Sequence, residues 1–320
     1  MESVIRHTTL TVIALAALGG GCSAPSYVET GRMERGLVVI LPGIEGTSAF
    51  NVAICEGLAA GRVEYGIEIY DWTSFLNPME NLRDEARNRR RAAVLAEHIV
   101  SYQDAYPGRP VFLVGQSGGG GMAVWVAEAM PEGRSLEGVV LLAVSLSPGY
   151  HLDKALDHCR RGIVSFYSAR DWVFLSVGTK VFATMDGKHA ESAGREGFVS
   201  AGTPAYQRLH QIPWQASMAL AGNLGLHMTS GAGEFVRYYV APLILCGRWD
   251  WQVIGRLARG EWIDPRQYPG VAASQPGPTE PAAASQPPPA APAPPAPPAS
   301  QPAPPTRPAT TPGEIPVEDG

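Results

Sequence analysis

The sequence contains little cysteine, and its cysteines do not have the spacing of a metal or redox site. There are 4 cysteines in 320 residues, and no two of them form a CxxC pair. This number is too small for a fold held together by disulfides, and the spacing gives no sign of a zinc or dithiol centre. The folded part of the chain must therefore be stabilised by a hydrophobic core.

Charged residues are also scarce, at 17% of the chain with a formal net charge of -5. Soluble globular domains have about 25% charged residues. The low charged fraction comes from a C-terminal stretch that begins near Pro269. This stretch is dominated by proline, alanine, glutamine and serine, and no aromatic residue follows Tyr268. The globular domain is therefore shorter than the whole chain.

Positive charge is concentrated in one helix-like run, beside the acidic residues Asp84, Glu85 and Glu97. The arginines of this run are Arg83, Arg87, Arg89, Arg90 and Arg91. Opposite charges at this spacing predict a solvated helix face with ion pairs. Outside this run there is no basic block, so the sequence gives no electrostatic reason to expect a nucleic-acid partner.

The N-terminal apolar run is too short for a membrane-spanning helix, which needs roughly 20 residues. It covers residues 10–18, follows Arg6, and is followed by three glycines and Cys22. This pattern predicts an export signal over residues 1–21. It is similar to a bacterial lipoprotein signal, which implies lipidation of Cys22 and attachment to the cell-envelope membrane. A secreted or periplasmic soluble protein is the alternative.

We expect a tether over residues 22–35, a folded domain over residues 36–267 and a tail over residues 268–320. The tail repeats Ala-Ser-Gln-Pro, starting at Ala273, Ala284 and Ala299. It has few apolar side chains to offset the entropy of ordering, and proline favours extended polyproline II structure. The prediction is a disordered spacer that could contact the cell envelope.

The cysteines other than Cys22 number three, so they can form at most one disulfide. They are Cys55, Cys159 and Cys246, and each lies in an apolar context. This context favours buried thiols, although the pairing stays open.

Apolar runs that end in turn residues alternate with helical patterns through the domain. The predicted strands are residues 37–41, 67–70, 111–115, 138–144 and 162–166, with a late strand near 212–214. The predicted helices are residues 51–60, 82–106, 122–130 and 234–245. This alternation predicts an α/β fold with a mostly parallel central sheet flanked by helices.

The main chemical signal is the segment from Gly115 to Gly119, which reads GxSxG with Ser117 at its centre. The bare pattern is weak, but this copy directly follows a buried strand and precedes a helix. In such a turn the serine adopts a strained backbone conformation, and the glycines remove Cβ atoms that would collide with the strand or helix. The serine hydroxyl then lies at a helix N-terminus, which favours negative charge.

In this context residues 35–246 resemble the α/β-hydrolase fold family of serine hydrolases. The resemblance implies a catalytic triad in the chain order Ser, Asp, His. By position, Ser117 is the nucleophile, Asp171 after the fifth strand is the acid, and His227 in a glycine-rich loop is the base. The alternatives by position are Asp153, Asp157 and Asp186 for the acid, and His189 and His210 for the base.

The same resemblance implies that two backbone N–H groups stabilise the oxyanion. They belong to Gly118, after the nucleophile, and to Ile44, in the loop after the first strand. That loop has Pro42 where the family usually carries histidine. Three aromatic residues are candidates for a substrate pocket, although core packing would explain them equally well: Trp72, Phe75 and Trp172.

No cofactor is expected, and no metal. One segment suggests a metal site by composition, because it contains His151, Asp153, Asp157, His158 and Cys159. On a helix, however, these side chains would not converge. We therefore expect an exported hydrolase of carboxylic esters, with lipid-like esters favoured. A peptidase or acyltransferase with the same triad, or an inactive binding or scaffold protein, remains an alternative.

Overall fold

The computed structural model describes residues 27–74, 77–171, 174–175, 179–180, 184–188 and 191–268. The predictions for Cys22, Phe75, Trp172 and His189 lie outside these residues, and so do those for the signal and the proline-rich segment 269–320. The described residues to 268 belong to one compact unit.

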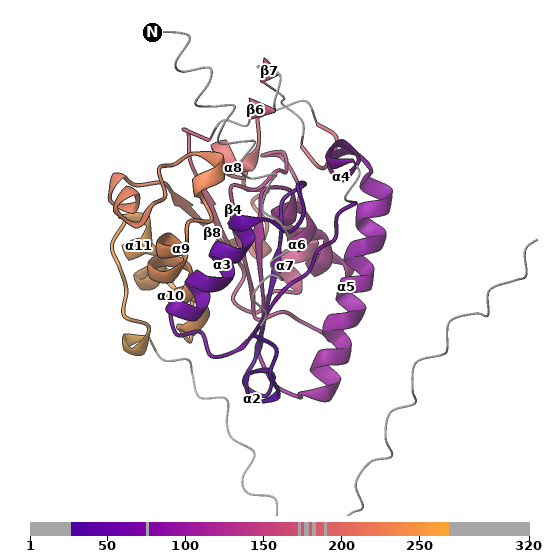
Figure 1. The fold of residues 1–320 in the computed structure, drawn as a ribbon, viewed down its shortest axis with the longest axis vertical. Helices are drawn as coiled ribbons and strands as arrows, with labels where there is room; N and C mark the ends of the chain where they lie inside the picture. The colour runs from indigo at the N-terminus through magenta and orange to yellow at the C-terminus, as the bar shows by residue number, and fades with distance from the viewer. Residues whose placement is uncertain are drawn as a thin grey trace, which may run out of the picture. The chain divides into compact units, whose positions relative to one another are not determined.

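A sheet of six strands forms the centre of this unit, and every neighbouring pair is parallel (Figure 1). The strand order is β2-β1-β3-β4-β5-β8. The strands are β1 (Leu37–Leu41), β2 (Gly66–Ile69), β3 (Val111–Gln116), β4 (Gly138–Leu142), β5 (Ile163–Tyr167) and β8 (Leu209–Pro213). The predicted fold class, a mostly parallel sheet flanked by helices, is confirmed.

The strands are apolar along their whole length because both faces of the sheet are covered. Every residue of β1, β3 and β4 is buried. Since side chains alternate along a strand, Val39 belongs to the core on one face and its neighbours Val38 and Ile40 to the core on the other. Continuous apolar runs are typical of strands in this position.

Helices pack on the two faces in two layers. On one face are α5 (Glu85–Ala105) and α6 (Gly118–Ala129), whose apolar residues share a core with Val39. On the other are α3 (Ala49–Ala60), α10 (Ala241–Leu245) and α11 (Trp251–Ala258). In Figure 1, α5 lies at one edge of the view and α10 and α11 lie at the opposite edge. In the described part of the chain, no helix is both long and apolar enough to cross a membrane.

Shorter elements connect these layers. The helical ones are α2 (Thr30–Met33), α4 (Pro78–Arg83), α7 (Asp153–Asp157), α8 (Ala193–Glu196), α9 (Gly233–Phe235) and a π-helical turn (Val236–Val240). Among the described residues, four 3-10 turns cover Pro204–Arg208, Ala216–Ala221, His227–Thr229 and Pro265–Gln267. The strands β6 (Phe174–Leu175) and β7 (Thr179–Lys180) pair antiparallel with each other.

The helix predicted over residues 82–106 is divided into α4 and α5 at Asp84. Asp84 has a non-helical backbone, and its side chain accepts a hydrogen bond from the Arg87 N–H at the start of α5. Asn77 caps α4 in the same way, through the Glu80 N–H. Short acceptor side chains are preferred at helix N-termini because they satisfy N–H groups that have no partner within the helix.

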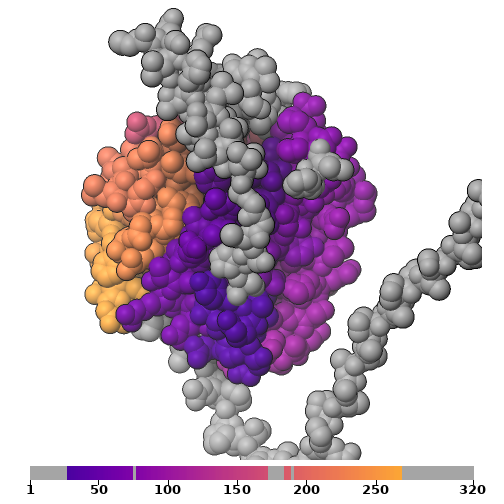
Figure 2. Space-filling view, viewed as in Figure 1, coloured from indigo at the N-terminus to yellow at the C-terminus, as the bar shows by residue number. Residues whose placement is uncertain are grey.

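The segment before β1 differs from the predicted tether. Tyr27 pairs with Ile67 of β2 through two backbone hydrogen bonds. Arg32 in α2 donates to the carbonyls of Tyr65 and Val63 at 2.9 and 2.6 Å. Residues 27–35 are therefore attached to the edge of the sheet, because their polar groups find backbone partners there. Figure 2 shows the indigo surface of the early residues between a purple and an orange surface of later ones.

Candidate active site

Ser117 lies at the sharp turn between β3 and α6, as predicted. Its backbone has φ 53° and ψ -122°, in the left-handed region that non-glycine residues rarely adopt. The turn is so tight that a Cβ atom on Gly119 would lie 2.0 Å from the Leu41 carbonyl oxygen. A Cβ atom on Gly115 would lie 2.4 Å from the Gly119 carbonyl oxygen. Both flanking glycines are therefore required by sterics.

The structure brings His227 and Asp171 to this serine. His227 Nε2 lies 2.8 Å from Ser117 Oγ, and His227 Nδ1 lies 2.9 Å from Asp171 Oδ1. The exposed fractions are 7% for His227 and 4% for Asp171, so both contacts are shielded from water, whereas Ser117 is half-buried. Residues separated by 110 and 56 positions thus form one hydrogen-bonded chain.

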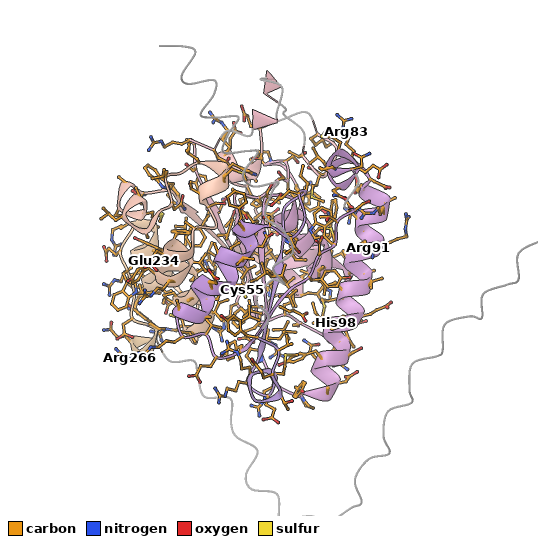
Figure 3. The ribbon with its side chains drawn as sticks, in the orientation of Figure 1. Cys55, Arg83, Arg91, His98, Glu234 and Arg266 are labelled. Atoms are coloured by element: carbon orange, nitrogen blue, oxygen red, sulfur yellow. The ribbon has the colours of Figure 1, made fainter. Side chains whose placement is uncertain are left out.

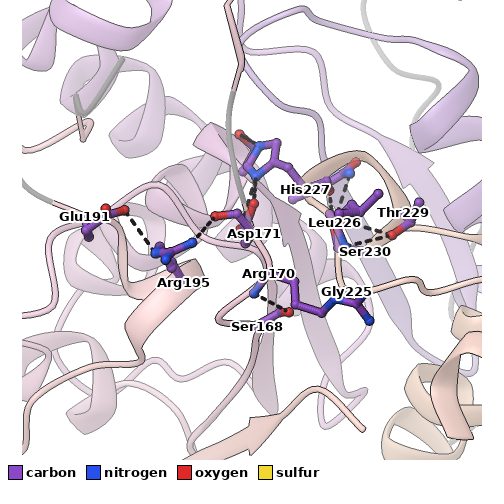
Figure 4. A network of polar contacts seen from close by, with 12 residues as sticks. Ser168, Arg170, Asp171, Glu191, Arg195, Gly225, Leu226, His227, Thr229 and Ser230 are labelled. Carbon is purple, nitrogen blue, oxygen red and sulfur yellow. Dashed lines mark hydrogen bonds and ion pairs between the residues drawn. The ribbon is translucent and has the colours of Figure 1, made fainter. Parts of the chain in front are cut away.

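Asp171 is fixed by the turn that follows β5. Its N–H donates to the Ser168 carbonyl at 2.8 Å, and its own carbonyl accepts from the Arg195 guanidinium at 3.3 Å. Arg195 is in turn paired with Glu191 at 3.3 Å. Figure 4 shows Asp171 between Arg195, which contacts its backbone carbonyl, and His227, which contacts its carboxylate. The turn therefore aims the carboxylate at the imidazole.

The His227 loop is tied to the residue that precedes the nucleophile. Ser230 Oγ donates to the His227 carbonyl at 2.9 Å, within the 3-10 turn His227–Thr229 and the residue after it. The Gln116 amide donates to Ser230 Oγ at 3.3 Å. Neither Ser230 nor Gln116 was predicted from the sequence. The sequence offered one signal for this contact: Ser230 lies three positions after the predicted base, where its hydroxyl can bond to the His227 carbonyl.

The predicted oxyanion donors lie beside each other. A Cβ atom built on Gly118 would be 3.5 Å from the Ile44 nitrogen. Among the described residues, no acceptor for the Ile44 N–H or the Gly118 N–H is found outside regular helical bonding, and Gly118 is the first residue of α6, whose N–H has no partner within the helix. Both groups are therefore open to an external acceptor at the serine.

Of the aromatic residues considered for a substrate pocket, the structure describes Trp72, and it places this residue in the core, the second of the two interpretations that the sequence left open. Its side chain is fully buried, and its Nε1 donates to the Pro42 carbonyl at 2.8 Å. It therefore supports the loop after β1 from inside the core and does not line an accessible pocket. A cavity of about 20 Å³ is lined by Asp171, Ser168, Trp214 and Asn223, among others. It has room for about one water molecule, so it is too small for a substrate.

The rival acids and the described rival base have other partners. Asp186 accepts from the Ser147 N–H at 3.0 Å, and Asp153 accepts from Thr203. Asp157 pairs with Arg208 at 3.1 Å. His210 lies on β8, where burial lowers the pKa of its imidazole. None of these contacts involves Ser117.

In the segment that suggested a metal site, the candidate side chains do not converge on one point. His158 Nδ1 contacts the Arg134 carbonyl at 2.9 Å, while Asp153 and Asp157 have the partners given above. Among the described residues, no group of three or more histidine, cysteine, aspartate or glutamate side chains is placed to hold a metal ion.

The arginine run is a solvated face except at Arg87. Arg83 and Arg91 are exposed, and Figure 3 shows them pointing away from the domain. Arg89 pairs with Glu85 and Glu128 at 2.7 and 3.0 Å. Arg87 is instead half-buried and donates to the Asn81 side chain and the Trp72 carbonyl, both at 3.1 Å.

Two carboxylates adjoin the loop after β1. Burial raises the pKa of Glu45, although its own backbone and the charge of His227 oppose this effect. Asp71 is different: partial burial would raise its pKa, but hydrogen bonds from Thr73 and Thr47 outweigh burial and lower it. Asp71 accepts from the Thr47 N–H at 2.9 Å and so holds the end of the loop.

The three cysteines of the domain are buried thiols, as predicted. Burial raises the pKa of Cys55 to about 11 and those of Cys159 and Cys246 to about 12. At neutral pH the thiols are therefore protonated and inert.

No protein-family model and no curated protein matches the sequence. Solved structures with a similar fold include esterase PE8, with 15% identity and a TM-score of 0.41 over 67% of this chain and 97% of that chain. They also include LpqC, a poly(3-hydroxybutyrate) depolymerase from Bordetella parapertussis, with 15% identity and a TM-score of 0.43 over 77% and 97% of the two chains. Lipase B from Aspergillus fumigatus has 15% identity and a TM-score of 0.40 over 77% and 57%.

Proposed function

We propose that the protein is a serine hydrolase that cleaves carboxylic esters through an acyl-enzyme. The observation that carries this proposal is the continuous hydrogen-bonded chain from Ser117 through His227 to Asp171. A serine hydroxyl is a weak nucleophile at neutral pH, and an adjacent oriented base is the arrangement that activates it. The two open N–H groups of Ile44 and Gly118 supply the second requirement, hydrogen-bond donors for developing negative charge.

In the acylation step His227 Nε2 accepts the hydroxyl proton while Ser117 Oγ attacks the ester carbonyl carbon. The carbonyl oxygen becomes an oxyanion and receives hydrogen bonds from the N–H groups of Ile44 and Gly118. When the intermediate collapses, the bond to the alkoxy oxygen breaks, and His227 returns the proton to the leaving alcohol. Ser117 is left as an acyl ester.

In the deacylation step water takes the place of the alcohol. His227 accepts a proton from the water as its oxygen attacks the acyl carbonyl, and then returns a proton to Ser117 Oγ. The products are the carboxylic acid and the regenerated serine. Asp171 keeps the Nδ1 proton of the imidazole in place and stabilises the imidazolium in both steps.

Apolar acyl groups, as in lipid-like esters, are the proposed substrates. The His227 loop exposes three apolar side chains, with 47% of Leu224, 45% of Leu226 and 46% of Met228 accessible. Large apolar residues gathered on one loop are typical of a surface that contacts an apolar ligand. A peptidase or an acyltransferase would use the same triad, so the substrate assay must separate these activities.

The test is a panel of p-nitrophenyl esters with acyl chains of two to twelve carbons, assayed beside aminoacyl p-nitroanilides. We expect ester turnover that exceeds amide turnover and increases with chain length. Ser117→Ala should reduce kcat by about six orders of magnitude if the triad acts as a unit. Ser101→Ala is the control, since Ser101 is on α5 and bonds to the Glu97 carbonyl. Preferred turnover of the anilides, or wild-type ester turnover in Ser117→Ala, would refute the proposal.

We further propose that the enzyme acts at the cell-envelope membrane, anchored through lipidated Cys22. The sequence pattern before Cys22 supports this location. Cys22→Ala should move the full-length protein from the membrane fraction to the soluble fraction. Unchanged fractionation would rule out the lipid anchor.

A further inference from the structure

The loop after β1 must hold the Ile44 N–H in a fixed direction if it is to act as an oxyanion donor. Pro42 has no side-chain donor that could do this. The loop carbonyls are instead held one after another by three donors. Trp72 Nε1 donates to the Pro42 carbonyl at 2.8 Å, the Gly46 N–H to the Gly43 carbonyl at 3.1 Å, and Asn81 Nδ2 to the Ile44 carbonyl at 2.9 Å.

These three bonds determine where the Ile44 N–H points. The Gly43 carbonyl and the Ile44 N–H belong to the same peptide unit, which is planar and trans, so they point in opposite directions. Because the Gly46 N–H binds the carbonyl on one side, the Ile44 N–H faces the other side, next to Gly118. A peptide unit can reverse its direction only if its neighbours also rotate. The bonds from Trp72 and Asn81 to the two adjacent carbonyls oppose that rotation.

The two side-chain donors are themselves buried and braced. Trp72 is fully buried, and Asn81 is 1% exposed. The Asn81 Oδ1 atom accepts from the Ser74 N–H at 2.8 Å and from Arg87 at 3.1 Å. With the oxygen thus occupied by donors, the Asn81 NH₂ group must face the Ile44 carbonyl.

Further contacts join the two donors to each other. The Arg87 guanidinium that contacts Asn81 also donates to the Trp72 carbonyl at 3.1 Å. Asn88 Nδ2 donates to the Asn81 backbone carbonyl at 2.7 Å. A fully satisfied buried network of this kind is rigid, since moving one member leaves others without partners.

We propose that Trp72 and Asn81 are positioning residues that fix the Ile44 N–H as an oxyanion donor. This inference rests on the proposed function, because it assigns a role within the same site. Both side chains are buried, and they act through the peptide units on either side of the Gly43 carbonyl. The indole N–H and the amide NH₂ thus supply the hydrogen bonds to the loop that the Pro42 side chain cannot donate.

A weakened oxyanion donor has a specific kinetic effect. The oxyanion forms only along the reaction path, so looser positioning should lower kcat and leave KM nearly unchanged. Removal of one oxyanion donor outright costs about 10²- to 10³-fold in kcat. Because the Ile44 N–H remains present when its support is removed, we expect a smaller loss of about 10- to 100-fold.

The experiment compares Trp72→Phe with Trp125→Phe. Trp125 is a matched control, because it is 1% exposed and its Nε1 donates at 3.0 Å to the Tyr150 hydroxyl, on the α5 and α6 side of the core. With a p-nitrophenyl ester, Trp72→Phe should lose about 10- to 100-fold in kcat with KM within twofold of wild type. Binding of a phenylboronic acid, whose serine adduct is tetrahedral, should weaken in parallel. Trp125→Phe should stay within twofold in every measurement.

A second variant and a second readout keep the test decisive. Asn81→Asp retains the size of the side chain and removes both N–H donors, so it should give the same kcat loss if Trp72→Phe fails to fold. Hydrogen exchange of the Gly46 N–H, which binds the Gly43 carbonyl, should accelerate in both variants and not in Trp125→Phe. The proposal is overturned if the folded variants keep wild-type kcat and boronate affinity, or if KM changes as much as kcat.

The exchange measurement separates this inference from the proposed function. If the wild-type protein turns over no ester, the proposed function fails, while exchange of the Gly46 N–H still decides whether Trp72 and Asn81 hold the loop. If the wild type is active and the variants are equally active, the positioning role alone fails.

Discussion

Gln116 and Ser230 are 114 positions apart in the sequence, yet the Gln116 amide donates a 3.3 Å hydrogen bond to the Ser230 hydroxyl. Ser230 in turn donates to the carbonyl of His227. The residue that precedes the nucleophile is thus connected to the loop that carries the base. The distance between Ser117 and His227 therefore depends on a contact between the end of β3 and the His227 loop, as well as on the fold of each segment.

Ser230→Ala removes this connection and should loosen the His227 loop. A hydrogen bond contributes about 1 kcal/mol, so we expect a fall in kcat of about fivefold with KM unchanged. Ser230→Thr keeps the hydroxyl and should restore most of the loss. Steady-state kinetics with a p-nitrophenyl ester measures both variants. Equal activity of Ser230→Ala and the wild type would show that the connection is dispensable.

Asp171→Asn should lower kcat by about 10⁴-fold while the protein stays folded, because the amide favours the wrong tautomer of His227, as in the established Ser-His-Asp triad. Asp186→Asn is the control. Asp186 is a rival acid by sequence position, but it accepts its hydrogen bonds from Ser147 and not from His227. Ester turnover of the two variants measures the difference. A larger loss in the Asp186 variant would reassign the acid.

Gly119→Ala should prevent the native turn at Ser117, because the new Cβ would lie 2.0 and 2.4 Å from the carbonyl oxygens of Leu41 and Pro42. We expect a destabilisation of more than about 3 kcal/mol or a failure to fold, which urea unfolding would measure. Gly149→Ala is the matched change, since nothing lies within 4 Å of the place where its new Cβ would stand. Similar unfolding midpoints for the two variants would contradict the packing described here.

The buried thiols should resist alkylation in the native state. With pKa values of about 11 for Cys55 and about 12 for Cys159 and Cys246, very little thiolate exists at pH 8. Thiolate is the reactive form, so iodoacetamide should modify none of the three in the folded protein and all of them in guanidinium chloride. Mass spectrometry counts the adducts. Rapid native alkylation of Cys159 would show that this part of the core opens.

The sheet could be predicted from sequence because its strands are buried on both faces. Runs such as residues 37–41 and 111–115 are continuously apolar, and the structure places strands there with ends shifted by at most one residue. The candidate roles of Ser117, Asp171 and His227 came from the resemblance to a hydrolase family, applied to the elements that the pattern revealed. Their mutual distances did not follow from it.

The support of the oxyanion loop could not be predicted, because it depends on contacts across the fold. The sequence left Trp72 between a substrate pocket and the core, and it predicted Arg87 on a solvated face. The structure turns the indole inward to Pro42 and the guanidinium to Asn81. A pattern of apolar and charged residues shows which positions are buried, but not which polar groups meet there.

The most direct measurement of the central claim is the site and rate of labelling by a fluorophosphonate probe in the native protein. We predict one modified residue, Ser117, identified by mass spectrometry of the labelled peptide. We also predict that His227→Ala slows labelling by at least about 10³-fold, because the base that activates the serine is lost. A folded wild-type protein that is not labelled at Ser117, or a His227→Ala variant that is labelled at the wild-type rate, would contradict the assignment of the triad.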